Sequence, residues 1–235
     1  MSLNATTFIK NRTNSISLTQ KRINKILTCV IVSYEKIIAN GVIFDYSKKG
    51  KVKKEDYLRN RLVDDFLEYE LEIVDNGTNN FTINKETSEE YINLIDKLLH
   101  DDPIDIHIVD YALKNAWSQA SKPYFAIECK RLKTSISGYI DDIKKATKRN
   151  YSKFRLPIEG QLGFIENKNW SSKDVCDKVK KNLFSNPNIQ TTNNIRSYSV
   201  KNKFSDSYVS NHTKINNTSF SICHLFLDYS NIVVN

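Results

Sequence analysis

Two short apolar segments of the chain carry charged side chains that a buried strand normally excludes. One spans Pro103–Val109 and contains Asp105 and His107; the other spans Tyr124–Leu132 and contains Glu128. Both are rich in β-branched and aromatic residues, which predicts strands. Because charge inside such a strand is costly unless a site requires it, these segments are the first candidates for chemistry.

Alternation of side chains along a strand sorts these residues onto two faces. Asp105 and His107 share one face of the first strand, and Glu128 and Lys130 share one face of the second. The opposite, apolar faces comprise Ile104, Ile106 and Ile108 in the first strand and Phe125, Ile127 and Cys129 in the second. If the strands pair as a hairpin, a carboxylate from each strand and one ammonium group meet on the polar face.

Two carboxylates held close together repel each other, and their pKa values rise unless a cation neutralises them. A divalent metal ion is therefore a natural occupant of such a site. Oxygen ligands without sulfur or paired imidazole favour Mg²⁺ or Mn²⁺ over zinc. The sequence thus predicts a magnesium or manganese site at Asp105 and Glu128.

The arrangement of these residues is similar to a known pattern. Asp105, followed 23 positions later by Glu128-Cys129-Lys130, resembles the PD-(D/E)xK signature of restriction-endonuclease-like nucleases. The segment Ile127–Leu132 resembles the catalytic strand of a bacterial branch of this superfamily. The segment Glu55–Arg59 is similar to the family's first helix, and Gly160–Ile165 to the strand after the next helix. The resemblance covers roughly residues 53–228.

This resemblance implies an α/β fold with a restriction-endonuclease-like core, in which a central mixed sheet is flanked by helices. It implies a Mg²⁺- or Mn²⁺-dependent endonuclease that hydrolyses phosphodiester bonds. A metal ion would be held by Asp105, Glu128 and the main-chain carbonyl of Cys129. Lys130 would orient or deprotonate the attacking water or stabilise the phosphoryl charge, and Glu55 would complete the site from its helix.

Two positions of this site have rival candidates. Pro103 is not adjacent to Asp105, as the family pattern would have it, and Asp102 is an alternative ligand. Asp105 is preferred because it lies inside the strand, whereas Asp102 precedes a proline and is expected to end a loop. Asp56 competes with Glu55, since a helix presents only one of two consecutive residues to a site.

Charge is unevenly distributed along the 235 residues, whose net charge is +8. Residues 63–110 hold two basic and fourteen acidic side chains, while the rest of the chain holds 33 basic and 13 acidic. A basic run without any acidic residue covers positions 143–158. We expect five of its residues to bind a phosphate backbone, four of them as a helical stripe: Lys144, Lys145, Lys148, Arg149 and Lys153. A solvated, lysine-rich surface accounts for the same pattern.

Periodicity places these motifs on elements. A helical extension is expected over residues 1–52 and a nuclease-like domain over residues 53–235, together forming one compact unit. Helices are expected at Ser15–Asn40, Lys54–Leu71, Thr87–Leu99, Ser137–Phe154 and Ser172–Phe184. Further strands are expected at Phe81–Ile83, Gln161–Ile165 and Ser219–Asp228, and a polar loop at Asn186–Asn194. The helix at Lys54–Leu71 should bury Leu58, Leu62, Phe66 and Tyr69.

Composition favours a soluble cytoplasmic protein that does not enter a membrane. The four cysteines match no zinc or redox spacing, so reduced thiols are expected, and the longest apolar run is too short to span a bilayer. The family resemblance favours DNA over RNA as substrate and a role in bacterial restriction or antiphage defence. It leaves room for a helicase or ATPase partner and for a homodimer.

Two other classes of function stay open. A catalytically silent nucleic-acid-binding or scaffold subunit would use the basic run alone. A hydrolase of small phosphates would need a closed pocket, and none of the six glycines forms a phosphate-binding loop motif.

Overall fold

The computed structural model describes residues 5–114 and 122–234. Its centre is an eight-stranded mixed sheet with the strand order β5-β2-β3-β4-β6-β9-β8-β7. The strands are β2 (Phe81–Asn93), β3 (Leu99–Asp110), β4 (Tyr124–Leu132), β5 (Arg149–Tyr151), β6 (Ile158–Ile165), β7 (Gln190–Ser197), β8 (Ser207–Thr213) and β9 (Ser219–Asp228). Two very short strands, β1 (Phe44–Asp45) and β10 (Val233–Val234), pair in parallel beside it.

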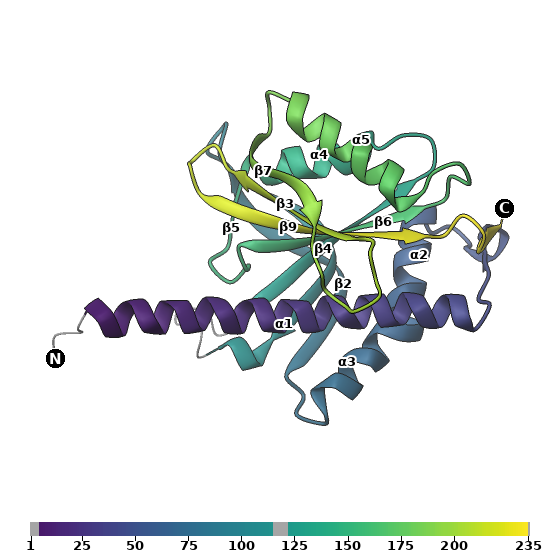
Figure 1. The fold of residues 1–235 in the computed structure, drawn as a ribbon, viewed down its shortest axis with the longest axis horizontal. Coiled ribbons are helices and arrows are strands. Elements are labelled where there is room, and N and C mark those ends of the chain that lie inside the picture. Colours follow the sequence, from purple (N-terminus) through teal and green to yellow (C-terminus); the bar gives the residue numbers. More distant parts are fainter. Residues whose placement is uncertain (1–4, 115–121, 235) are drawn as a thin grey trace.

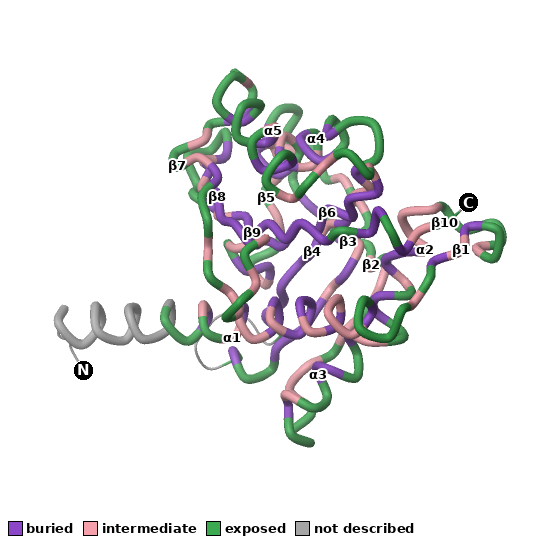
Figure 2. Tube along the Cα trace, turned by 45° about the vertical axis from the view of Figure 1, so that its right-hand side comes forward, coloured by how far each residue is buried: buried purple, intermediate pink, exposed green. Residues whose placement is uncertain are grey.

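Helices cover both faces of this sheet (Figure 1). One side holds α1 (Ala5–Ala39), α2 (Lys54–Leu62) and α3 (Glu68–Asp75); the other holds α4 (Ser137–Ala146) and α5 (Ser172–Ser185). A main core fills the space under the first three helices, and a second core lies under α4 and α5. The central strands are buried along most of their length (Figure 2). The predicted α/β fold with a mixed sheet flanked by helices is therefore confirmed at this level.

The N-terminal helix belongs to the main core. Ile23 and Leu27 of α1 are fully buried there, and Phe44 of β1 pairs with Val233 near the C-terminus. Helix α1 ends before Gly41, whose φ of +61° suits a residue without a side chain. Apolar residues between Ile23 and Tyr46 thus pack into the same core as the residues that follow. None of the described helices combines the length and the apolar composition needed to cross a bilayer.

A π-helical turn joins α2 to α3 and rotates the buried face. The turn spans Val63–Leu67 and adds about one residue to each turn of the helix. Leu58 and Leu62 are buried as predicted, whereas the side chain of Tyr69 is 59% exposed and Leu71 is buried in its place. The expectation for Tyr69 was wrong because it assumed an uninterrupted 3.6-residue period.

The two candidate strands pair as an antiparallel hairpin, with Ile106 opposite Ile127. The neighbouring ladder between β2 and β3 lacks the pair between Glu86 and Asp105, and Glu86 has a φ of +51°. Ile104 packs in a small cluster apart from the main core that contains Ile106 and Ile108. The prediction that these three isoleucines share a face was therefore wrong for Ile104, because the ladder is interrupted at Asp105.

Strand β2 continues where a helix at Thr87–Leu99 was predicted. It pairs with β3 from Phe81 opposite Asp110 to Ile92 opposite Leu99. This pairing satisfies the backbone groups that a helix would have satisfied locally. The Thr87 capping signal is overridden because long-range pairing decides the structure of this segment.

Helix α4 ends at Ala146, eight residues before the predicted Phe154. The chain then turns into β5, where Tyr151 pairs with Tyr91 at the edge of β2. A continuous helical stripe of basic residues was therefore a wrong prediction, since only Lys144 and Lys145 lie on the helix. The predicted strand Ser219–Asp228 coincides with β9, whereas β7 begins inside the predicted loop Asn186–Asn194.

Candidate functional site

A pocket of about 330 Å³ opens where β3 and β4 meet α2 and α4, and eight acidic side chains outnumber six basic ones in its wall. We call it the acidic pocket. Asp105, Glu128, Lys130 and Glu55 all line it, so the structure brings together the four residues predicted to be catalytic. The other acidic residues are Asp56, Glu86, Asp102, Asp142 and Glu159, and the other basic residues are Lys53, Arg59, Lys145, Arg149 and Arg155.

Asp105 is held by two donors. Its Oδ1 accepts a hydrogen bond from Nη1 of Arg59 at 2.9 Å, and its Oδ2 accepts one from the backbone N–H of Cys129 at 2.7 Å. The second bond ties the aspartate of β3 to the strand that carries Glu128. Asp105 and Glu128 also line the same pocket, as the proposed shared site requires.

Glu128 has no fixed partner. Within residues 5–114 and 122–234 its carboxylate accepts no hydrogen bond and forms no ion pair. Burial and the neighbouring charge of Asp105 raise the pKa of Glu128 to about 8. A divalent cation between the two carboxyl groups would remove this repulsion and lower the pKa of Glu128 again.

Lys130 is held between two carboxylates. Its Nζ donates to Oε1 of Glu55 at 3.0 Å and forms an ion pair with Oδ2 of Asp142 at 3.2 Å. Burial lowers the pKa of Lys130, but the charges of Asp142 and Glu55 outweigh that effect and raise the pKa above its usual value. Lys130 therefore stays an ammonium ion at neutral pH and is unsuited to deprotonate water.

Glu55, rather than Asp56, is the helix residue that contacts the predicted triad. Besides Lys130, Glu55 accepts a hydrogen bond from the backbone N–H of Arg131 at 3.0 Å. Asp56 also lines the pocket, but its carboxylate lies 3.4 Å from Arg59. The rival ligand Asp102 forms an ion pair with Arg149 of β5.

Cys129 can contribute only its main chain. Its side chain lies in the main core, fully buried, and burial raises the pKa of its thiol well above the usual value. Its N–H group bonds to Asp105, and metal binding by its carbonyl stays a prediction. His107 faces Tyr124, with 4.5 Å between ring centroids, and does not line the acidic pocket.

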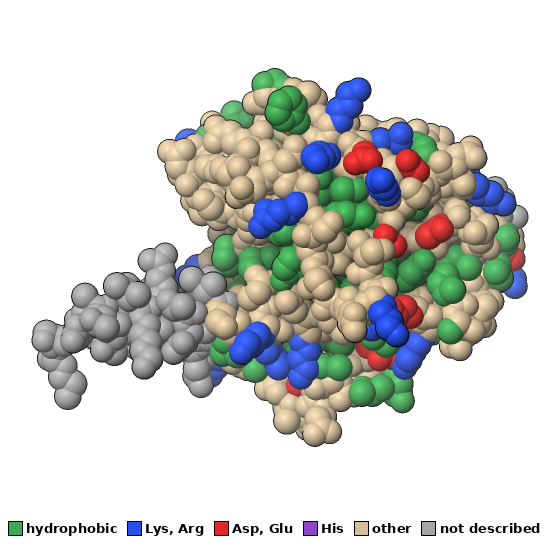
Figure 3. Space-filling model, viewed as in Figure 1, with side chains coloured by type: hydrophobic (Ala, Val, Ile, Leu, Met, Phe, Trp, Pro, Cys, Tyr) green, Lys and Arg blue, Asp and Glu red, His purple; other side chains and the backbone are tan. Residues whose placement is uncertain are grey.

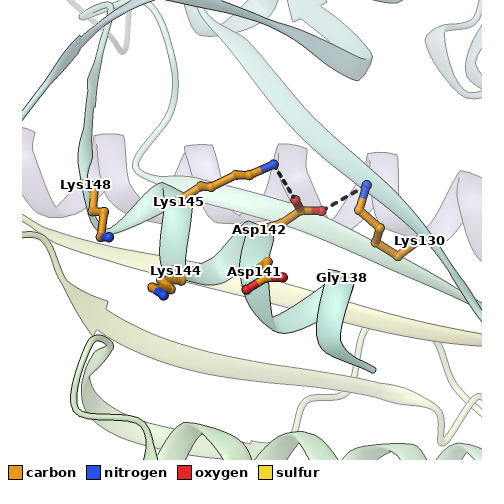
Figure 4. A pocket seen from close by; sticks show the side chains of 7 residues that line it. All are labelled: Lys130, Gly138, Asp141, Asp142, Lys144, Lys145 and Lys148. Atoms are coloured by element: carbon orange, nitrogen blue, oxygen red, sulfur yellow. Dashed lines mark ion pairs between the residues drawn. The ribbon is translucent and has the colours of Figure 1, made fainter. Parts of the chain in front are cut away.

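A second pocket, of about 370 Å³, adjoins the first (Figure 4). We call it the lysine pocket; it is lined by Lys130, Gly138, Asp141, Asp142, Lys144, Lys145 and Lys148. Lys130 and Lys145 converge on Asp142, at 3.2 and 3.5 Å (Figure 4). The ammonium groups of Lys144 and Lys148 do not reach Asp142 and form no ion pair in the described part of the chain.

The predicted basic stripe is thus divided between two places. Lys144, Lys145 and Lys148 line the lysine pocket, whereas Arg149 lies in the acidic pocket, paired with Asp102 and 4.4 Å from the ring centre of Tyr91. Lys153 lies 5.6 Å from the ring centre of Phe154 and lines neither pocket. On the face drawn in Figure 3, basic and acidic side chains are interspersed, and no single basic patch dominates.

Sequence reasoning missed two side chains that hold the predicted residues in place, Arg59 and Asp142. Arg59 lies one helical turn after Glu55, so the spacing i, i+4 on a shared face could have indicated it. Asp142 gives no such local signal, because it reaches Lys130 through the packing of α4 against the sheet.

No group of three or more His, Cys, Asp or Glu side chains is arranged as a metal site in residues 5–114 and 122–234. The predicted set has two carboxylates and one main-chain carbonyl, which are hard oxygen donors suited to Mg²⁺ or Mn²⁺. The unpartnered carboxyl group of Glu128 beside Asp105 fits such an ion. Comparison with known proteins gives no further identification: no family model, curated protein or solved structure matches the chain.

Proposed function

We propose that the chain is a divalent-metal-dependent nuclease with a restriction-endonuclease-like core that hydrolyses phosphodiester bonds of DNA. The observation that carries this proposal is the unpartnered, half-buried carboxyl group of Glu128 beside Asp105, with the ammonium group of Lys130 in the same pocket. The family resemblance of the Glu128–Lys130 strand supports it.

Charge balance supports a role for a cation in the acidic pocket. A phosphate would be repelled by eight acidic side chains against six basic ones unless a cation lay between them. Asp105 and Glu128 would hold a Mg²⁺ or Mn²⁺ ion, with the Cys129 carbonyl as a third ligand. Such an ion supplies a water molecule of lowered pKa and polarises the phosphate.

The chain's own residues would contribute position and charge. Lys130 would place an ammonium group beside the phosphoryl oxygens and stabilise the negative charge that develops there. Glu55 and Asp142 would hold that ammonium group in place from two different helices. Lys144 and Lys148 in the adjoining pocket would bind a neighbouring phosphate of the same strand.

Two observations favour a second candidate, a catalytically silent nucleic-acid-binding subunit. Arg59 already neutralises Asp105, and the described residues contain no ready-made three-residue metal group. In this reading the acidic pocket is structural and only the lysine pocket binds DNA. An effector role in bacterial restriction or antiphage defence is supported by the family resemblance alone.

A cleavage assay separates the two candidates. Plasmid, linear and single-stranded DNA, and RNA, are incubated with the protein and Mg²⁺, and binding is measured in parallel. We expect Glu128→Ala and Lys130→Ala each to slow cleavage by roughly 10²–10³-fold or more, because each removes charge from the reacting centre. The exposed residues Glu90 and Lys133, changed to Ala, serve as matched controls.

Each outcome decides between the candidates. Cleavage by the wild type that is lost in both site variants, with DNA binding retained, supports the nuclease. DNA binding by the wild type without cleavage in Mg²⁺ or Mn²⁺ supports the silent subunit. Cleavage that survives Glu128→Ala rules out the proposed site.

A further inference from the structure

Arg59 is a buried cation in the wall of the acidic pocket. Its side chain is 1% exposed, yet Nη1 lies 2.9 Å from Asp105 and Nη2 lies 2.7 Å from Glu86. Asp56 lies 3.4 Å from Nη1, and the side chain of Asn60 accepts hydrogen bonds from Nε and Nη2. The guanidinium group therefore joins carboxylates from α2, β2 and β3.

This placement puts a positive charge within hydrogen-bonding distance of a predicted metal ligand. Asp105 is one of the two carboxylates proposed to hold a divalent ion, and Arg59 binds one of its two oxygens. A guanidinium ion and a divalent cation beside one carboxylate repel each other strongly where little water screens them. Full contact of both with Asp105 is unfavourable.

We propose that Arg59 is an internal counter-cation of the acidic pocket, which neutralises Asp105 in the metal-free protein and moves off Asp105 when a divalent cation binds. The inference rests on the proposed function and adds a residue that controls the affinity of the site for a divalent cation. Arg59 would compete with the metal ion for Asp105 and so weaken metal binding.

The structure supplies a place for the displaced guanidinium group. Glu86 and Asp56 bind it independently of Asp105, so its charge stays paired after it leaves that carboxylate. The side chain of Glu86 is 58% exposed, which allows the Arg59–Glu86 pair to shift toward solvent. Glu86 also lies opposite Asp105 at the gap in the β2–β3 ladder, where these two residues are not paired with each other.

Calorimetric titration with Mn²⁺ or Mg²⁺ alone tests the proposal. We expect Arg59→Gln to bind the ion roughly tenfold more tightly or better than the wild type, because a competing charge has been removed. Arg61→Gln is the matched control, since Arg61 lies on the same helix and pairs with Asp65 outside the pocket. The control should bind the ion like the wild type.

Arginine side-chain NMR of the wild type provides a second measurement that needs no stability of a variant. The Nε–H resonance of Arg59, assigned by through-bond experiments on the wild type, should shift as Mg²⁺ is added, while that of Arg61 stays in place.

The two ways of failing are distinct. Equal or weaker binding by a folded Arg59→Gln variant, or an unmoved Arg59 signal in a wild type that binds the ion, would overturn the counter-cation role and leave the nuclease proposal intact. Absence of ion binding in the wild type and in every variant would overturn both.

Discussion

The acidic pocket and the lysine pocket share Lys130, Asp142 and Lys145, yet they are built in different ways. The acidic pocket is assembled from α2, β2, β3, β4 and α4, and Arg59, Asp105 and Lys130 are each held there by two or more partners, whereas Glu128 has none among the described residues. The lysine pocket is formed mainly by one helix and the turn after it, and two of its lysines have no ion-pair partner among the described residues. The difference suggests chemistry in the first pocket and adaptable phosphate binding in the second.

The pH dependence of cation binding should distinguish the pockets most strongly. Since the pKa of Glu128 is raised to about 8, a proton must leave before this carboxyl group can bind a metal ion. Mg²⁺ affinity, measured by calorimetry, should rise about ninefold from pH 6 to pH 7 and about fivefold from pH 7 to pH 8, and should level off above pH 8. A Glu128→Gln variant should bind weakly with no such rise, and a pH-independent wild type would contradict the assignment.

Removing the unpaired lysines should affect DNA binding. The double substitution Lys144→Glu and Lys148→Glu should weaken binding by roughly 10–100-fold at low salt and reduce the slope of log affinity against log salt by about two. Fluorescence anisotropy measures both quantities. The matched control is Lys173→Glu with Lys181→Glu, two exposed residues of α5 that line neither pocket. An equal loss in the control would show that only net charge matters.

Asp142 lies between the pockets, so Asp142→Asn should affect them in opposite directions. Loss of its charge frees Lys130 from one of its two carboxylates, and we expect cleavage to slow by about tenfold. The same loss makes the lysine pocket more positive, so DNA should bind several-fold more tightly. Single-turnover cleavage and anisotropy separate the effects. Asp141→Asn, which changes only the lysine pocket, should reproduce the gain in binding with a smaller loss of rate.

Acid should destabilise the buried histidine network that holds α4, the helix of the lysine pocket, against the sheet. Tyr139 of α4 bonds to Nδ1 of His224 at 2.8 Å, and Ser210 bonds to Nε2 of both His224 and His212 at 2.7 Å. Burial lowers the pKa of His224 to about 3 and of His212 to about 4. The unfolded chain binds more protons than the folded one between those values and about 6.5, so the histidines lower the free energy of unfolding as pH falls through this range.

Comparison of variants isolates this effect. Glu128 acts in the opposite sense, because its raised pKa favours the folded state as pH falls from about 8 toward 4.5. Urea unfolding at pH 7 and pH 5 should therefore show His224→Gln losing roughly 1–2 kcal/mol less than the wild type on acidification. The exposed His100, changed to Gln, is the control. A His224→Gln variant with the wild-type pH dependence would contradict the account.

The local sequence pattern predicted that Asp105, Glu128 and Lys130 would lie together, but it did not predict the residues that surround them. Strand alternation brought Glu128 and Lys130 to one face, and pairing of the hairpin brought Asp105 to the same side. Arg59 and Asp142 come from helices whose packing depends on the whole fold. The β2 strand replaced a predicted helix because its partner β3 follows it in the chain and pairs with most of its length.

The π turn and the early end of α4 had a similar origin. The positions of Tyr69 and of the basic stripe were predicted on the assumption of regular helices. A π-helical turn at Val63–Leu67 shifts the buried face before Tyr69, and the chain after α4 pairs as β5 with the edge of β2 instead of continuing the helix. Such interruptions depend on partners that are distant in sequence, so periodicity could not indicate them.

The most direct measurement of the central claim is the position of a metal ion. Anomalous diffraction from crystals soaked in Mn²⁺ should show one peak bound by carboxylate oxygens of both Asp105 and Glu128, at about 2.1 Å, with Lys130 beside it. A peak that contacts neither or only one of these carboxylates, or no peak at saturating Mn²⁺, would contradict the account.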